Sequence, residues 1–300
     1  MASSGQPADA TVVVVTYDAL PWIERCLESV ARAPTIVVDC GSRDGTVASV
    51  RSRFPHVTVI AVENRGLGAA WNVGLRSSES RYVLLLNADA WLAGDALSRL
   101  VAFADGEPRA AVVAPRLLNP DGSLQRSVRG FPTLWRLATE YFFLRKLAPR
   151  SRLLNSFYGD GFAYDEVRSA EFVMGACLLV RRQAVEDVGY VDEEFFLFSE
   201  ETVWCFRFRE AGWRVLFFPG AECVHVGAAS HGGRLYRENL RGHLLFFWKH
   251  RGPEQAEKAR RLLLAAVRMR GVLFRGERAR TYREAARWLG SGDVATLLGK

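Results

Sequence analysis

The sequence predicts an α/β protein with a mostly parallel central sheet flanked by helices, followed by a helical segment. The first part of the chain alternates short β-branched or aliphatic runs with helical stretches. Those runs lack the polar alternation of half-exposed strands, a pattern typical of strands buried on both faces of a parallel sheet. From about Leu235 onward, apolar residues recur at helical spacing instead.

The first half contains four expected strands, at Thr11–Thr16, Thr35–Asp39, Val57–Val62 and Tyr82–Leu86. Helices are expected between them, from Pro21 to about Arg32, from the Gly41–Gly45 turn to about Arg53, and within Gly66–Ser77. This repetition predicts right-handed crossovers in a parallel sheet. Ligands of such sheets bind at the carboxyl ends of the strands. Four polar residues lie at or just past such ends: Asp39, Asn64, Asn87 and Asp89.

The middle of the chain is less regular. Strands are expected at Ala111–Leu118, Phe172–Val180, Arg214–Phe218 and Cys223–Val226, and a helix at Glu200–Ala211. Residues 131–160, rich in aromatics and Arg, are expected to form an insert of helix and loop. The stretch GAASHGG, residues 227–233, is the best boundary candidate. We therefore expect a flexible N-terminus at 1–10, a main domain at 11–233 with halves 11–118 and 119–233, and a helical segment at 234–300.

Composition narrows the class of protein. The 300 residues are 49% hydrophobic, enough for a buried core, and the net charge is +7. The five cysteines show no Cys-x-x-Cys spacing, which argues against a disulfide framework or zinc site and favours a reducing compartment. The first ten residues lack signal-peptide features, and no apolar run approaches the roughly 20 residues of a bilayer span. We expect a cytoplasmic protein, at most peripheral at the inner face of the cell membrane.

Two turns after predicted strands suit a nucleotide. In VDCGSRDGT, residues 38–46, Asp39 can accept a hydrogen bond from a base or ribose, and Asp44 is an N-cap candidate. In NRGLGAAWN, residues 64–72, two glycines precede a helix N-terminus, which suits an anion. Ordinary turn chemistry explains the first turn equally well. The second is not a dinucleotide fingerprint, because Trp71 occupies the third glycine position. The sequence has neither a Walker A motif nor Gly-x-Ser-x-Gly, so nucleoside triphosphatase and α/β-hydrolase functions lose support.

Acidic and imidazole side chains offer candidates for chemistry. LLLNAD brings Asp89 to the end of a buried strand, where a carboxylate can hold Mg²⁺ or Mn²⁺, or simply cap a turn. Glu200 and Glu201 follow the apolar run FFLF at a predicted helix start. They suit either the helix dipole or, with a raised pKa, a general base. A lone histidine in an apolar strand, such as His225, is more often a core residue, and it gains meaning only near Asp89.

Taken in order, these segments resemble a known family. The segments are VVVVTYD, VVDCGSRDGT, ENRGLGAAWNVG, YVLLLNAD, APRLLNPDGSLQRSVRGFP, GACLLVRR, VGYVDEEFFLFSEE, REAGWRV and CVH. They resemble the family-2 inverting glycosyltransferases over about residues 11–250, especially the branch with rhamnosyltransferases of cell-wall and O-antigen assembly. The resemblance implies a GT-A fold, a divalent cation (Mn²⁺ or Mg²⁺) and a nucleotide-diphosphate sugar donor: a dTDP-, UDP- or GDP-sugar, with dTDP-rhamnose among them. It implies inverting transfer to a hydroxyl of a polysaccharide, a lipid-linked glycan or a small molecule.

The resemblance also assigns roles by position. Glu201, with its neighbour Glu200, takes the place of the family's base, while Asp89 and His225 take the metal or diphosphate positions. The residues expected at the nucleotide sugar are Thr16, Asp39, Cys40, Ser42, Asp44, Asn64, Gly66, Asn72, Asn87, Asp89, Gly175, Ala176 and Arg207. Among them, Arg207 would face the diphosphate, and Gly175-Ala176 would let the sugar approach the backbone.

Several positions depart from the family pattern. Cys40 replaces the usual Asn, Ala88 replaces the Pro of Asn-Pro-Asp, and Glu-Asp-x-Asp has become Glu200-Glu201-Thr202-Val203. The base is one methylene longer, and a displacement of about 1 Å can cost on the order of a hundredfold in rate. A catalytically silent domain that binds nucleotide sugar or scaffolds a partner is therefore the alternative. A nucleotidyltransferase is a third hypothesis, but its usual Gly-rich, basic start is absent.

The Arg-rich C-terminal segment leaves two interpretations open. Segments such as Glu257–Arg270 suit either peripheral contact with anionic lipid or packing on the main domain. We expect no nucleic-acid partner, and the sequence does not define the oligomeric state.

Overall fold

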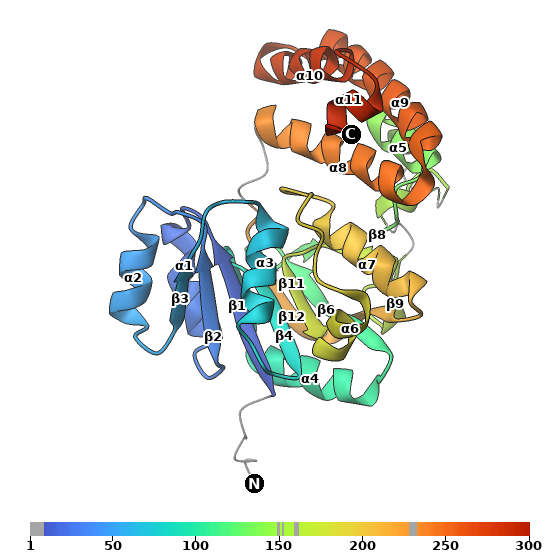
Figure 1. Ribbon diagram of the computed structural model, residues 1–300. Coiled ribbons are helices and arrows are strands. Elements are labelled where there is room, and N and C mark those ends of the chain that lie inside the picture. The colour runs from blue at the N-terminus through green and yellow to red at the C-terminus, as the bar shows by residue number, and fades with distance from the viewer. Residues whose placement is uncertain (1–8, 149–150, 152, 159–161, 228–232) are drawn as a thin grey trace.

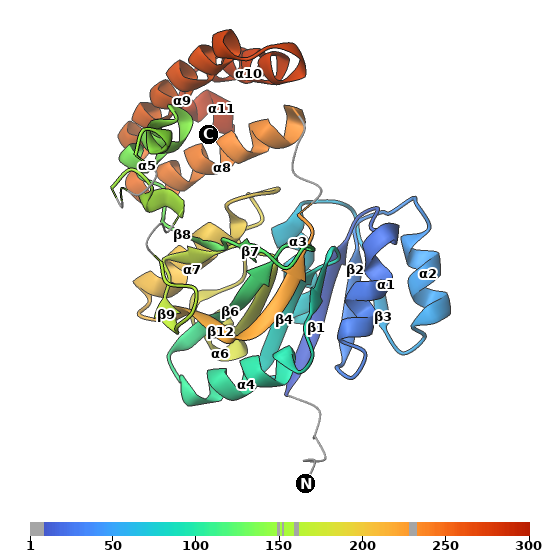
Figure 2. The same cartoon turned by 180° about the vertical axis from the view of Figure 1, so that it is seen from behind.

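The computed structural model describes residues 9–148, 151, 153–158, 162–227 and 233–300. Figure 1 shows a body built around a sheet with helices on its faces, and a separate helical layer. Figure 2 shows the same arrangement from behind, and both views place that layer beyond the carboxyl ends of β1 and β4. The predicted α/β class, with a mostly parallel sheet and C-terminal helices, is confirmed.

The first half follows the predicted alternation. Its elements are β1 (Ala10–Thr16), α1 (Leu20–Ser29), β2 (Thr35–Asp39), α2 (Thr46–Arg53), β3 (Thr58–Ala61), α3 (Leu67–Arg76), β4 (Tyr82–Asn87), β5 (Ala90–Leu92), α4 (Ala96–Gly106) and β6 (Ala110–Leu118). β1, β2 and β4 are buried along nearly their whole length, as expected for aliphatic strands covered on both faces. β1 begins at the buried Ala10, one residue earlier than predicted, and residues 1–8 of the expected flexible N-terminus lie outside the described residues. Sequence analysis did not predict β5 or α4.

The second half is more interrupted. Its elements are β7 (Leu124–Gln125), β8 (Val128–Arg129), α5 (Leu134–Tyr141), 3₁₀ helices at Leu144–Lys146 and Ser156–Tyr158, β9 (Arg168–Ser169), β10 (Phe172–Val173), β11 (Cys177–Arg181), α6 (Arg182–Val188), α7 (Glu200–Glu210), β12 (Arg214–His225), α8 (Gly233–Arg251), α9 (Pro253–Leu273), α10 (Gly276–Leu289) and α11 (Val294–Leu298). The short α6 was not predicted either.

Two strand predictions in this half were wrong. The single strand expected at Phe172–Val180 is divided, because β10 pairs with β8 in a small separate sheet while β11 joins the main sheet. The two short strands expected at Arg214–Phe218 and Cys223–Val226 are one strand, β12. A shift in its register against β6, between Phe218 and Glu222, accommodates Pro219 and Gly220 within this one strand.

The sheet order explains why polar residues gather at one edge. The strands run β3-β2-β1-β4-β11-β6-β12-β5, with β7 beside β6 and β9 beside β12. β1, β2, β3 and β4 are mutually parallel, and so are β6 and β12, whereas β11 is antiparallel to both of its neighbours. The carboxyl ends of β1, β2 and β4 therefore lie together. β12 pairs antiparallel with β5, which sets His225 opposite Ala90.

The helical layer joins the insert to the C-terminal helices. Arg270 of α9 is buried and donates hydrogen bonds to the carbonyls of Tyr141 at 2.8 Å and Glu140 at 2.9 Å, while its guanidinium lies over the Phe143 ring. Thus α5 of the expected insert packs against α9. Of the expected boundary at 227–233, residues 228–232 lie outside the described residues, and the division into domains stays a prediction. In the described parts of the chain, no helix combines the length and the apolar character that a bilayer crossing requires.

Candidate active site

A polar contact at the carboxyl edge of the sheet joins Asp89 and His225. Asp89 follows β4, and the pairing of β12 with β5 brings the histidine beside it. His225 Nε2 lies 3.5 Å from Asp89 Oδ1, and Asp89 Oδ2 accepts a hydrogen bond from the Gly227 N–H at 3.0 Å. We expected a functional role for His225 only if it lay near Asp89, and in the fold the two side chains do lie side by side.

Gln125 fixes the proton on the His225 ring. Its Nε2 donates to Asn119 Oδ1 at 2.9 Å and to the His225 carbonyl at 3.2 Å, so Oε1 is the atom 2.7 Å from His225 Nδ1. Because an amide oxygen can only accept, Nδ1 carries the proton and Nε2 presents a lone pair towards Asp89. Burial lowers the pKa of His225, against the opposing effect of the Asp89 carboxylate, which favours the neutral ring. A neutral imidazole nitrogen and a carboxylate oxygen are suitable ligands for Mn²⁺.

The turn after β2 is braced by Asp39. Its Oδ2 accepts hydrogen bonds from the N–H groups of Gly41 at 3.0 Å and Ser42 at 3.2 Å. Ser42 Oγ in turn accepts from the Asp18 N–H at 2.9 Å, which ties this turn to the one after β1. Burial raises the pKa of the Cys40 thiol to about 11, so this thiol stays protonated near neutral pH. Hydrogen bonds within the protein therefore hold this turn in shape.

Asp44 and Thr16 differ in how their oxygens are used. Asp44 accepts from the N–H groups of Thr46 at 3.0 Å and Leu20 at 2.8 Å, but Gly45 is the N-cap of α2, one residue later than predicted. Thr16 Oγ1, at the end of β1, is buried and has no hydrogen-bond partner within the described ranges. Since a buried unpaired hydroxyl is costly, Thr16 is the group on this side that still needs a partner.

The N-terminus of α3, predicted to suit an anion, is covered by backbone. The Leu67 N–H donates to the Phe196 carbonyl at 2.9 Å, and a Cβ added at Gly66 would lie 2.3 Å from that same oxygen. Asn64 Oδ1 accepts from the Gly66 N–H at 3.2 Å and so shapes the turn. The structure therefore uses this turn to hold the segment around Phe196.

Asn72 holds the same segment from inside α3. Its Nδ2 donates to the Val191 carbonyl at 2.8 Å, and its Oδ1 accepts from the Val191 N–H at 3.0 Å. A second bond from Nδ2 reaches Glu193 Oε1 at 2.9 Å. With both ends of its amide engaged, Asn72 acts on the segment that leads into Glu200.

Glu200 and Glu201 open α7 after a strained backbone turn. Phe198 and Ser199 both lie in the left-handed region, with φ of 67° and 71°. Glu200 is 3% exposed, and Oε2 of each glutamate is buried without a hydrogen-bond partner in the described part of the chain. Burial raises the pKa of Glu200, and the charge of Glu201 raises it further. Burial also raises the pKa of Glu201, although backbone N–H groups, including that of Gly175, partly offset this. Buried carboxylates of this kind suit general-base chemistry.

Gly175 and Ala176 link the glutamates to the Asp89 edge. A Cβ added at Gly175 would lie 3.8 Å from Glu201 Cβ and 2.6 Å from the Trp71 ring, so only glycine fits here. The next carbonyl, that of Ala176, accepts from the Asn87 N–H at 3.0 Å. Asn87 stands two residues before Asp89. One short backbone segment therefore contacts both Glu201 and the strand end that carries Asp89.

Arg207 is directed away from this edge. Its guanidinium donates to the carbonyls of Val188 and Tyr190, the latter at 2.7 Å, at the end of α6.

Two residues near the edge were not predicted from the sequence: Gln125, and Arg129 of β8, whose charge lowers the pKa of Glu201. Both lie in the segment NPDGSLQRSVRGFP, where polar residues among turn formers were the available signal.

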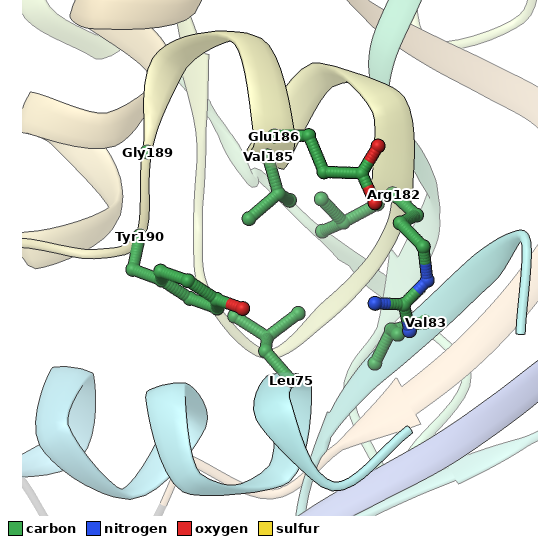
Figure 3. A pocket seen from close by; sticks show the side chains of 8 residues that line it. Leu75, Val83, Arg182, Val185, Glu186, Gly189 and Tyr190 are labelled. Atoms are coloured by element: carbon green, nitrogen blue, oxygen red, sulfur yellow. The ribbon is translucent and has the colours of Figure 1, made fainter. Parts of the chain in front are cut away.

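A small pocket lies at the opposite end of β4. Figure 3 shows side chains of Leu75, Val185 and Tyr190 around it, with Arg182 and Glu186 at one side. Its volume is about 110 Å³, well below the roughly 300 Å³ of an ordinary ligand pocket. None of the predicted site residues lines it, and it is not a candidate for the nucleotide site.

Comparisons with known proteins bear on the family and the fold of this chain. Residues 11–189 match the family model described as glycosyl transferase family 2. An N-acetylglucosaminyl-diphospho-decaprenol L-rhamnosyltransferase of Mycobacterium tuberculosis is 31% identical over 238 residues, which cover 74% of this chain and 77% of the relative. A poly-beta-1,6-N-acetyl-D-glucosamine synthase of Staphylococcus aureus is 24% identical over 241 residues, covering 77% of this chain and 53% of the relative.

Among solved structures, GalNAc-T7 with UDP, GalNAc and Mn²⁺ superposes with a TM-score of 0.59 at 15% identity, covering 94% of this chain and 56% of that one. At this level of identity the likeness concerns the fold, which is a GT-A fold.

Proposed function

This chain belongs to glycosyl transferase family 2, and from that premise we propose that it transfers a sugar, with inversion, from a nucleotide-diphosphate sugar to an acceptor hydroxyl. The observation that carries the proposal is the approach of His225 Nε2 to Asp89 Oδ1, 3.5 Å apart. It supports the proposal because two side chains suited to binding a cation, from distant parts of the chain, meet at the edge of the sheet where ligands of such folds bind.

A divalent cation, Mn²⁺ or Mg²⁺, fits these two residues. Asp89 offers an oxygen, and the hydrogen bond from Gln125 leaves His225 with a free ring nitrogen. In the described part of the chain no group of three or more His, Cys, Asp or Glu could hold a metal, so donor phosphates and water would complete the coordination. The bound cation would neutralise charge that develops on the leaving nucleoside diphosphate.

The two glutamates divide the acid–base roles. Burial raises the pKa of both carboxyl groups, and the charge of Glu201 raises that of Glu200 further, so we assign the base role to Glu201. Glu201 then accepts the proton of the acceptor hydroxyl. The acceptor oxygen forms its bond to the anomeric carbon as the bond from that carbon to the diphosphate breaks, and no covalent enzyme intermediate is needed.

The donor and acceptor follow from the relatives. The Mycobacterium tuberculosis relative is named for L-rhamnose transfer to a diphospho-decaprenol glycan, which makes dTDP-rhamnose the first donor to test and a lipid-linked glycan the first acceptor. UDP- and GDP-sugars are the next donors. Thr16, Asp39 and Ser42 stand where the nucleotide would lie, at the ends of β1 and β2. We infer that the enzyme works in the cytoplasm at the inner face of the membrane, where a lipid-linked acceptor would be within reach.

Val203, which replaces the second Asp of the family's Glu-Asp-x-Asp pattern, is compatible with an active enzyme. Val203 is 1% exposed and packs in the hydrophobic core, so the replacement removes no carboxylate from the accessible surface. This weakens one of the two arguments for a silent domain, and the longer base at Glu201 is the other.

The experiment is a donor-turnover assay with a matched pair of variants. Purified protein is incubated with dTDP-rhamnose, UDP-sugars or GDP-sugars and Mn²⁺, and the released nucleoside diphosphate is measured. Asp89→Asn should abolish metal-dependent turnover, whereas Asp95→Asn should leave it unchanged, because Asp95 lies on the surface paired with Arg99. Donor binding without turnover across a broad acceptor panel would instead favour the silent domain.

A further inference from the structure

We propose that the hairpin of α9 and α10, residues 253–290, is a docking surface for an anionic lipid bilayer. We call it the basic hairpin. It holds ten basic side chains and four acidic ones, an excess of six in a chain whose net charge is +7. The basic residues are Lys258, Arg260, Arg261, Arg268, Arg270, Arg275, Arg278, Arg280, Arg283 and Arg287, and the acidic ones are Glu254, Glu257, Glu277 and Glu284. Most of the excess positive charge of the protein is therefore concentrated in one supersecondary element.

The positive charges on its outer surface are largely uncompensated. Glu254 and Glu257 already pair within α9, with Lys258, Arg260 and Arg261. Six arginines take part in no ion pair with the carboxylates that the structure describes: Arg268, Arg275, Arg278, Arg280, Arg283 and Arg287. All six are exposed. Their charge is thus available to a partner.

Three of these arginines form a continuous stripe. Arg280, Arg283 and Arg287 are spaced three and four residues apart, so they share one face of α10, and together with Gly276 they line a single shallow groove. Guanidinium groups arranged in this way suit the phosphates of lipid headgroups, which they can bind with paired N–H donors.

The tip of the basic hairpin is apolar and exposed. Val272 and Leu273, the last residues of α9, are 85% and 64% exposed. Leu147 is 79% exposed, and the Phe143 ring ties its segment to the same tip through Phe274, with ring centroids 5.9 Å apart. Exposed aliphatic side chains surrounded by arginines match a bilayer interface, where the apolar groups enter the acyl boundary and the cations stay at the headgroups. A nucleic acid would bind the arginines but would not bury the side chains of Val272 and Leu273 in an apolar environment. We therefore favour the bilayer.

The position of the basic hairpin suits a substrate at a membrane. In Figures 1 and 2, α9 and α10 belong to the layer beyond the carboxyl ends of β1 and β4, and α10 is its outermost helix, away from the sheet. The Asp89 edge of the sheet therefore faces the same side of the molecule as the docking surface. The docking proposal is argued from charge and exposure and does not depend on the proposed transfer reaction. Only the link between docking and a lipid-linked acceptor rests on that reaction.

The test is vesicle co-sedimentation of the full chain. We expect binding to vesicles of phosphatidylglycerol and phosphatidylcholine, background binding to pure phosphatidylcholine, and release as salt approaches about 1 M, where the Debye length is about 3 Å. The triple variant Arg280→Gln, Arg283→Gln, Arg287→Gln should bind roughly a hundredfold more weakly, from about tenfold or less per arginine. Val272→Ser with Leu273→Ser should also weaken binding without changing the charge.

A matched control removes the same charge elsewhere. Arg32→Gln, Arg51→Gln, Arg53→Gln changes exposed residues on and next to α1 and α2, and should bind vesicles like the wild type. Thermal melting and dTDP-rhamnose binding are measured for every variant, so that loss of docking is separable from loss of fold or of the donor site. Equal binding to neutral and anionic vesicles, equal weakening by both triple variants, or binding to RNA but not to vesicles would each overturn the proposal.

Discussion

The two ends of the candidate site are built in different ways. At the Asp89 end, strand register brings the two residues together, because the pairing of β12 with β5 carries His225 to the end of β4, and Gln125 then orients the ring. At the other end, Glu200 and Glu201 follow a strained turn at Phe198 and Ser199, and the buried Oε2 atom of each has no hydrogen-bond partner among the described residues. A sheet can position cation ligands through its own hydrogen bonds, whereas a buried base at the start of a helix that follows a strained turn needs neighbouring elements to hold that turn in place.

For the glutamates, that support comes from α3 and from the C-terminal helices. Gly242 of α8 lies so close to Ser199 that an added Cβ would be 2.7 Å from its Oγ and 3.0 Å from the Phe198 carbonyl. Lys249 pairs with both Asp192 and Glu194 at 2.6 Å, at the start of the same segment. The C-terminal helices, which carry no recognisable catalytic motif, therefore complete the base end of the site.

The largest effect should come from the base itself. Glu201→Gln keeps the size of the side chain but cannot accept the proton, so we expect kcat to fall by roughly 10²–10⁴. Mn²⁺ and donor binding should be unchanged, as measured by calorimetry, because the proposed cation ligands are Asp89 and His225 and the substitution keeps the volume of the Glu201 side chain. Since burial raises the pKa of Glu201, wild-type activity should decline with falling pH sooner than an ordinary carboxylate would predict. Equal losses of kcat and of donor affinity would contradict the separation of the two ends.

The difference between the two ends of the site also explains which features could be predicted from the sequence and which could not. β1, β2 and β4 are continuous aliphatic runs, so their type, and the polar residues at their carboxyl ends, followed from local pattern. The break between β10 and β11 did not, because Gly175 is required by contact with Trp71, more than 100 positions away in the chain. Likewise, Arg207 and Asn72 were placed at the donor by resemblance, while the structure occupies their polar groups with backbone atoms from the segment before α7. Such tertiary contacts have no periodic signature.

Gln125 offers a way to weaken the Asp89 end alone. Gln125→Leu removes the acceptor that holds the proton on His225 Nδ1, so the ring can turn an N–H towards Asp89 instead of a lone pair. Loss of such an outer contact typically lowers metal affinity about 10–100-fold. Mn²⁺ affinity is measured by electron paramagnetic resonance titration, and the tautomer of the metal-free ring by ¹⁵N NMR.

The control for this variant is Asn119→Ala, which removes one partner of Gln125 Nε2 but keeps Gln125 Oε1 as the acceptor for Nδ1. The remaining bond from Nε2 to the His225 carbonyl should hold the amide orientation, and with it the Nδ1-protonated tautomer. If Gln125→Leu bound Mn²⁺ like the wild type with an unchanged tautomer, the histidine would be set by other contacts.

The clamp on the base end can be loosened from α8. Gly242→Ala forces a methyl group against Ser199 and the Phe198 carbonyl, and overpacking of this kind costs typically about 1–3 kcal/mol in unfolding free energy. We also expect kcat to fall while Mn²⁺ affinity is retained. Gly106→Ala is the control, since a Cβ there meets nothing within 4 Å. Chemical denaturation measures the stability, and a Gly242→Ala variant as stable and active as Gly106→Ala would show that α8 does not constrain the turn.

The smallest effect concerns the pH dependence of stability at Glu200. Its pKa is raised in the folded state by burial and by the charge of Glu201. Such a group contributes its full stability below the pKa of the unfolded chain, about 4.3, and that contribution is lost as pH rises through the folded pKa. Glu200→Gln cannot ionise, so the melting temperature of the variant relative to the wild type should increase from acid to neutral pH. If the difference in melting temperature between Glu200→Gln and the wild type stayed constant over that range, Glu200 would have an ordinary pKa. The two ends of the site would then no longer differ in the electrostatic way proposed here.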